Sequence, residues 1–81
     1  MRYARSFLED LVQLDPLQHQ EIYDYVLTQM RQIESVYELP GLRPLDPSRI
    51  YYRFGLKDYL IGIEATGRII KLIRILPKPE V

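Results

Sequence analysis

The sequence predicts an α+β fold in which two N-terminal helices pack on a three- to four-stranded antiparallel β-sheet. Apolar residues at helical spacing are confined to the first half of the chain, strand-like segments fill the second half, and a proline-rich connector separates them. The chain has 81 residues, of which 47% are hydrophobic. A chain of this size buries only about 60% of its unfolded surface, so we expect one domain, 1–81, built around one core.

The first helix is expected to begin near Ser6, because Ser6 and Glu9 have the spacing of a capping box. One side of this helix is apolar and carries Phe7, Leu8, Leu11, Val12 and Leu14. The pair Asp15-Pro16 then predicts a corner, with Asp15 as the N-cap of the second helix and Pro16 in its first turn. Gln18 has the spacing that completes a second capping box.

The second helix is expected to run from Pro16 to Tyr37. Its apolar residues recur at steps of three and four: Ile22, Val26, Met30, Ile33 and Tyr37. The connector at 39–47 contains three prolines and one glycine, so neither a helix nor a strand ladder is expected to continue through it.

Three segments rich in β-branched and aromatic residues follow, at Ile50–Phe54, Tyr59–Glu64 and Ile69–Leu76. Only four residues separate each from the next, which predicts consecutive antiparallel hairpins. In the second strand Tyr59, Ile61 and Ile63 alternate onto one face, and we expect that face to contact the helices. The third strand is apolar on both faces apart from Lys71 and Arg74.

Charge divides the chain into two halves. Residues 1–40 hold three basic and seven acidic side chains, a balance of −4, whereas residues 41–81 hold eight basic and four acidic ones, a balance of +4. The net charge of zero argues against strong nucleic-acid affinity, although the basic second half is compatible with it. The alternative is that these cations are solvated residues of the strands.

The residue types exclude several kinds of site. The chain has no Cys and a single His, which rules out a disulfide and leaves no zinc site. We expect no metal and no cofactor, and we interpret His19 as a solvated side chain. No long apolar span or export signal is present in the sequence, so the expected location is the cytoplasm, with no membrane contact.

The ordered segments resemble the RelE/ParE family of toxins from type II toxin–antitoxin systems. Ile50–Glu64 is similar to the family's strand-turn-strand signature, and Ile73–Lys78 is similar to its closing segment. Ser6–Leu11 resembles its first helix, and Leu39–Leu45 resembles its connector. The resemblance implies a toxin that inhibits translation by ribosome-dependent mRNA cleavage, or acts on another target such as gyrase. It also implies an antitoxin protein as partner, with the ribosome and mRNA as further partners.

The same resemblance assigns candidate site residues. Catalytic roles fall on Arg53, Arg74 and Lys78, because cleavage of RNA needs cations and a proton donor together. RNA-binding roles fall on four further basic residues, Arg43, Arg49, Lys57 and Lys71. For Arg53 the competing interpretation is a strand arginine paired with Asp58 or Glu64.

Several positions depart from the family pattern, so part of the residue set expected for RNA cleavage is missing. Leu60 stands where the family has an arginine, Gly55 stands where a basic residue is frequent, and Pro77 stands where a histidine is usual. The family's first strand is nearly absent, since only five residues precede Ser6. Two alternatives therefore remain: a catalytically inactive RelE-fold binding module, and an unrelated small adaptor that forms homodimers through an exposed sheet edge.

Overall fold

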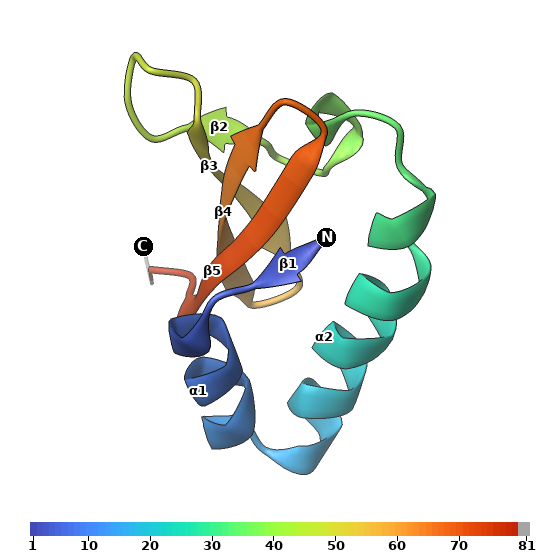
Figure 1. The fold of residues 1–81 in the computed structure, drawn as a ribbon. Coiled ribbons are helices and arrows are strands. Elements are labelled where there is room, and N and C mark those ends of the chain that lie inside the picture. Colours follow the sequence, from blue (N-terminus) through green and yellow to red (C-terminus); the bar gives the residue numbers. More distant parts are fainter. Residues whose placement is uncertain (80–81) are drawn as a thin grey trace.

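The computed structural model describes residues 1–79, which form two helices and one sheet of five strands (Figure 1). The elements in chain order are β1 (Arg2–Tyr3), α1 (Arg5–Gln13), α2 (Pro16–Thr28), the 3-10 turns η1 (Met30–Gln32) and η2 (Val36–Glu38), β2 (Arg43–Pro44), β3 (Tyr51–Leu56), β4 (Tyr59–Thr66) and β5 (Ile69–Pro77). The strands lie in the order β1-β5-β4-β3-β2.

The predicted hairpins are confirmed, but the predicted fold class is wrong. Strands β3, β4 and β5 form consecutive antiparallel pairs, as expected. Instead of three or four antiparallel strands, however, the sheet has five strands and is mixed, because β1 pairs with β5 in parallel and β2 pairs with β3 antiparallel. Both added strands are two residues long, too short to leave a periodic pattern in the sequence.

The first helix begins at Arg5, and no side chain caps its N-terminus. The predicted Ser6–Glu9 capping box is therefore wrong. The Ser6 hydroxyl instead donates a hydrogen bond to the carbonyl oxygen of Ile73, at 2.5 Å. The second helix begins as predicted, with the Asp15 side chain accepting from the backbone N–H of Gln18 at 2.9 Å.

The second helix ends at Thr28, nine residues before the predicted end at Tyr37. The chain continues through η1 and η2, and the second of these carries the capping box, formed by Ser35 and Glu38. Met30 is buried and Ile33 packs against the core. Apolar residues thus continue at helix-like intervals although the helix has stopped, which explains why periodicity overestimated its length.

The core lies between one face of the sheet and the helices. Its buried members come from all these layers: Phe7, Leu11, Ile22, Val26, Met30, Leu39, Tyr52, Phe54, Ile61, Ile63, Leu72 and Ile75. The predicted inward face of the second strand is confirmed, since Ile61 and Ile63 have no exposed surface and Tyr59 packs against the core. Within residues 1–79, no helix has the length and apolar character needed to cross a membrane.

The start of α2 is fixed to the β3–β4 turn by two polar contacts. The Tyr59 hydroxyl donates to the side-chain oxygen of Gln18, and the Lys57 ammonium lies 3.0 Å from the Glu21 carboxylate. The Gln18 side chain therefore bonds a strand residue and not the backbone N–H of Asp15. The expected second capping box is thus not formed.

A β-bulge interrupts the pairing of β4 with β5. Gly62 lies opposite Arg74 and Ile63 lies opposite Leu72, so Ile73 is an extra residue in β5. The extra residue reverses the alternation of side chains along the strand. Leu72 and Ile75 consequently both enter the core, and Arg74 between them remains exposed on the opposite face.

Beyond β1, the edge of β5 is closed by α1. Ala4 N–H donates to the Leu72 carbonyl at 2.8 Å, and Ser6 then binds the Ile73 carbonyl. One turn further, the Asp10 carboxylate accepts from the Ile75 N–H at 2.9 Å. Figure 1 shows β1 beside β5 and α1 following directly from it. Helix side chains thus satisfy strand groups that would otherwise need another strand.

Replacing Asp10 with Ala should destabilise the fold by about 1–3 kcal/mol, because it leaves the Ile75 N–H without its acceptor. The matched control is Glu9→Ala on the same helix, whose side chain is 65% exposed in a surface pair with Arg5. We expect this control to change the unfolding free energy by less than about 0.5 kcal/mol. Urea denaturation measures both, and equal effects of the two substitutions would contradict the role given to Asp10.

The Asp10 carboxyl should also make stability depend on pH. Partial burial alone would raise its pKa, but hydrogen bonds from Arg74 and from the Ile75 N–H outweigh burial and hold the pKa below its ordinary value of 3.8. A lowered folded-state pKa contributes stability above the unfolded value, and this contribution is lost as the pH falls through the folded value. We expect the unfolding free energy to fall less steeply between about pH 5 and about pH 2 in Asp10→Asn than in the unmodified chain. Glu9→Gln should keep the original slope, and identical slopes for all three proteins would refute the assignment.

Candidate functional site

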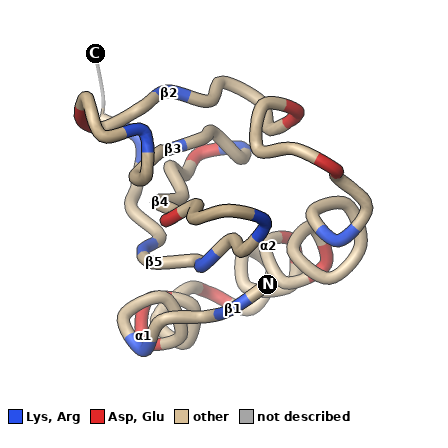
Figure 2. Tube along the Cα trace, turned by 45° about the horizontal axis from the view of Figure 1, so that its top comes forward, with Lys and Arg blue, Asp and Glu red and all other residues tan. Residues whose placement is uncertain are grey.

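The face of the sheet turned away from the core carries a row of three arginines. Arg43 of β2 pairs with Arg53 of β3, Arg53 pairs with Gly62 of β4, and Gly62 pairs with Arg74 of β5. Residues that pair directly across strands present their side chains on the same face. We call this row, together with the groove along it, the arginine face. Figure 2 shows basic positions on β2, β3 and β5 of the sheet.

A groove of about 190 Å³ runs along this row. Apart from Arg53 and Arg74, its lining side chains are mainly apolar and come from the connector and the three long strands: Leu45, Tyr51, Leu60, Ile73 and Leu76. Gly62 forms its floor. A Cβ at Gly62 would lie 3.9 Å from the Cβ of Arg74, which is an ordinary van der Waals contact.

The Arg74 guanidinium is held in place by α1. Its Nε lies 2.7 Å from Oδ2 of Asp10, and its Nη2 donates to Oδ1 at 3.3 Å. The hydrogen bond with Asp10 and its negative charge raise the pKa of Arg74, so this side chain is a permanent cation. About half of the Arg74 side chain, 48%, remains exposed and available to a ligand.

Arg53 is partly buried and forms no ion pair with any residue among 1–79. The predicted alternative pairing with Asp58 or Glu64 is therefore not present. Arg53 and Arg74 lie two strands apart, about 10 Å between backbones. Side chains of this length can reach one anionic group from opposite sides of Gly62.

Lys78 approaches the same face from the segment after β5. Its backbone N–H donates to the Asp58 carbonyl at 2.8 Å. A Cβ placed on Gly55 would lie 3.2 Å from the Lys78 Nζ, so the ammonium lies directly over this glycine. The structure therefore brings all three residues predicted as catalytic to the outer side of the sheet.

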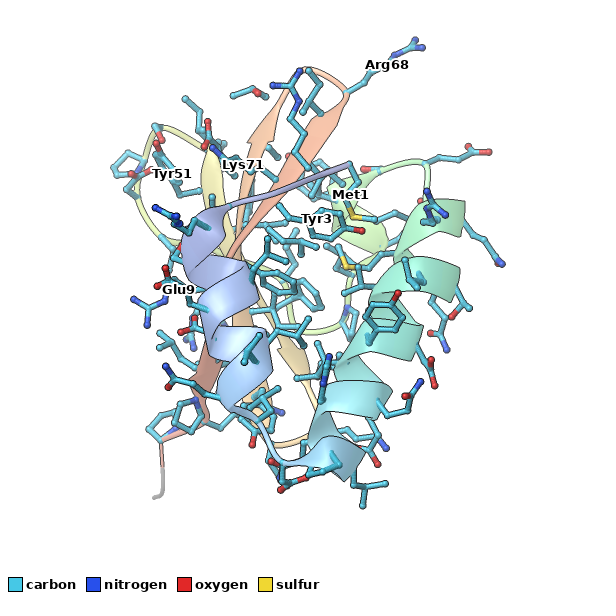
Figure 3. All side chains as sticks on the ribbon, turned by 60° about the horizontal axis from the view of Figure 1, so that its bottom comes forward. Met1, Tyr3, Glu9, Tyr51, Arg68 and Lys71 are labelled. Carbon is cyan, nitrogen blue, oxygen red and sulfur yellow. The ribbon has the colours of Figure 1, made fainter. Side chains whose placement is uncertain are left out.

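The four residues predicted to bind RNA do not share one surface. Arg43 belongs to the arginine row, and Lys71 lies one row away, opposite Glu64. Figure 3 shows Lys71 and Tyr51 on the same side of the sheet. Lys57, in contrast, is paired with Glu21 of α2, and Arg49 lines a different cavity. Their roles in RNA binding remain predictions.

The chemistry that the arginine face offers is anion binding. Arginine guanidinium groups in general bind anions and are poor proton donors at neutral pH. His19, the single histidine, lies on α2 and contacts Tyr23 edge to face, with ring centroids 6.1 Å apart. Among residues 1–79, no three His, Asp or Glu side chains converge as metal ligands. The face is thus suited to hold a negatively charged group beside apolar surface.

Sequence reasoning missed the apolar half of this site. Leu60 and Leu76 alternate with buried residues, so their outward direction was readable from the strand pattern. Leu45 comes from the connector, and only the pairing of β2 with β3 places it here. The role of Gly62 could not be predicted from the sequence, because it depends on Arg53 and Arg74, which pair with Gly62 from the two neighbouring strands.

Comparison with known proteins gives a fold likeness. The chain is similar to a chain of the RelB-RelE antitoxin-toxin complex from Methanococcus jannaschii, with a TM-score of 0.74 and 23% identity over 95% of this chain and 89% of that chain. It is also similar to a chain of the E. coli DinJ-YafQ complex, with a TM-score of 0.54 and 16% identity over 94% of this chain and 89% of that one. No family model matches the chain, and no match was found among curated proteins.

These findings correct the expected membership of the RelE/ParE toxin family. No family model supports it, and a likeness at 23% and 16% identity shows the fold alone. The first complex contains an antitoxin as well as a toxin, so the likeness does not carry the toxin role. The expected toxin function, through mRNA cleavage or another target such as gyrase, is not retained, and neither is the alternative of an inactive RelE-fold module or small adaptor.

Proposed function

We propose that this chain is one protein of a two-protein toxin–antitoxin complex and acts by binding the other protein. The observation that carries the proposal is the likeness to a chain of the RelB-RelE complex over 95% of this chain. The DinJ-YafQ complex supports it at a lower TM-score. The expected antitoxin partner is replaced by the broader proposal of a protein partner from such a pair, and nothing in the fold or the comparisons supports the ribosome as a partner.

The surface proposed to bind the partner is the arginine face. Arg53 and Arg74 line the groove together with three leucines, and Arg43 and Lys78 lie on the same face of the sheet. This combination favours a partner segment that is both acidic and apolar. Apolar side chains of the partner would fill the groove over Gly62. Its carboxylates would accept hydrogen bonds from Arg53 and Arg74, whose planar guanidinium groups suit two-point contacts.

Partial burial makes Arg53 the central residue of this proposal. It lies in the middle of the row, between Arg43 and Gly62, and has no ion pair within the described part of the chain. A charge-assisted hydrogen bond formed at a partly desolvated site contributes more than one at the rim of an interface. Arg43 and Lys78 are exposed and would mainly steer the partner by its charge.

Co-expression of this chain with the product of a neighbouring small gene tests the function. We expect a stoichiometric complex in size-exclusion chromatography with light scattering. We also expect one of the two proteins to stop growth when induced alone, and the other to restore it. The growth assay identifies which of the two roles this chain has. Absence of a complex, together with normal growth in every combination, would overturn the proposal.

Substitutions on the arginine face test the binding surface. Arg53→Glu and Gly62→Leu should each weaken the complex at least about tenfold, the first by charge reversal and the second by filling the groove. The matched controls are Arg31→Glu, a charge reversal on η1, and Gly62→Ala, whose Cβ would make only an ordinary contact at 3.9 Å. Both controls should keep the affinity within about threefold, as measured by titration calorimetry.

The same variants separate a protein partner from a nucleic acid. If the complex were unaffected by Arg53→Glu while binding of single-stranded RNA was lost, the arginine face would be a nucleic-acid surface and the partner would bind elsewhere. RNA binding through phosphates would also weaken steeply with salt.

A further inference from the structure

A second and larger cavity, of about 760 Å³, opens on the helix side of the sheet. It lies between the segment that carries η2 and the tip of the β4–β5 hairpin, beyond the end of α2; Figure 1 shows where these elements lie. Its floor includes Ala65 and Ile70, which pack against the core. Six polar side chains stand around it: Glu34, Ser35, Tyr37, Arg49, Tyr52 and Arg68.

Two cations stand on different walls of this cavity. Arg49 comes from the loop before β3, and Arg68 comes from the hairpin tip, where Figure 3 shows it projecting away from the body of the molecule. Among residues 1–79, neither is in an ion pair. Arg68 therefore stands at the rim, with a long side chain that can turn toward a bound anion.

The backbone at Arg49 is strained. Its φ angle is 58°, in the left-handed region that is unfavourable for residues other than glycine. Residues other than glycine keep such a conformation mainly in turns and at functional sites. Arg49 also lines the cavity of about 760 Å³, so this uncommon backbone conformation lies at its wall.

The third group in the cavity is aromatic. Tyr37 is 68% exposed and meets the nearly buried Tyr52 edge to face, with ring centroids 6.4 Å apart and an interplanar angle of 84°. Exposed aromatic faces of this kind are platforms on which planar ligands stack. The neighbouring Tyr37 side chain, together with burial, raises the pKa of Tyr52.

We propose that this cavity binds a small anionic ligand that carries a planar ring, of which a nucleoside monophosphate is the simplest example. Arg49 and Arg68 bind the phosphate from two sides, and the base stacks on Tyr37. The volume lies within the range of small-molecule sites, about 300–1,000 Å³. Glu34 also lines the cavity, and its negative charge opposes anion binding, which limits the affinity.

This site is separate from the arginine face. Tyr52 turns toward the core side of the sheet, whereas its neighbour Arg53 turns to the opposite face. Loss of nucleotide binding would therefore leave the proposed partner complex intact, and loss of the complex would leave nucleotide binding intact.

Titration calorimetry with AMP, adenosine and inorganic phosphate tests the proposal on the full chain. We expect AMP to bind more tightly than either fragment. Arg49→Gln and Arg68→Gln should each weaken AMP binding at least about tenfold. Tyr37→Ala should weaken AMP binding and leave phosphate binding unchanged, whereas Glu34→Gln should strengthen both.

The control is Arg53→Gln, which should bind AMP as the unmodified chain does. Each variant is checked for folding by its thermal transition, and Tyr37 and Arg68 are exposed enough for their removal to leave the core unchanged. The proposal is overturned if AMP does not bind, if adenosine or phosphate binds as tightly as AMP, or if Arg53→Gln and not Arg49→Gln abolishes binding.

Discussion

The rest of the structure depends on how the edge of β5 beyond β1 is satisfied, because no further strand pairs with it there. β1 covers it only as far as Leu72, and from there the polar groups of the strand are satisfied by side chains of α1. The Ser6 hydroxyl donates to the carbonyl oxygen of Ile73, and the Asp10 carboxylate accepts from the N–H of Ile75. These two hydrogen bonds hold the helix along the strand. The same carboxylate holds the Arg74 guanidinium, so the contacts that close the sheet also shape its outer face.

The β-bulge at Ile73 links the core to the arginine face. Without the extra residue, strict alternation from Leu72 would turn Arg74 into the core and Ile75 toward solvent. With it, Ile75 is buried and Arg74 stands in register with Gly62 and Arg53. Burial of an unpaired arginine would be unfavourable, so the hydrophobic effect and the desolvation of charge both select this register.

The features that the sequence predicted correctly depend on residues close together in the chain. The three long strands and the Asp15 cap depend on residues a few positions apart, and their patterns were visible without the fold. The end of α2, the two short strands and the role of Ser6 depend on partners far along the chain. The site divides in the same way: Arg53 and Arg74 stood out as candidates, but their common row with Arg43 follows from strand register.

The two outermost strands of the sheet have a consequence for self-association. Each is two residues long, and Pro44 in β2 has no N–H to offer. A strand from another molecule would therefore find few main-chain groups to extend the ladder, and edge-to-edge stacking of copies into filaments is disfavoured. Recognition by this protein is accordingly left to side chains on its broad surfaces, where composition can select one molecule over another.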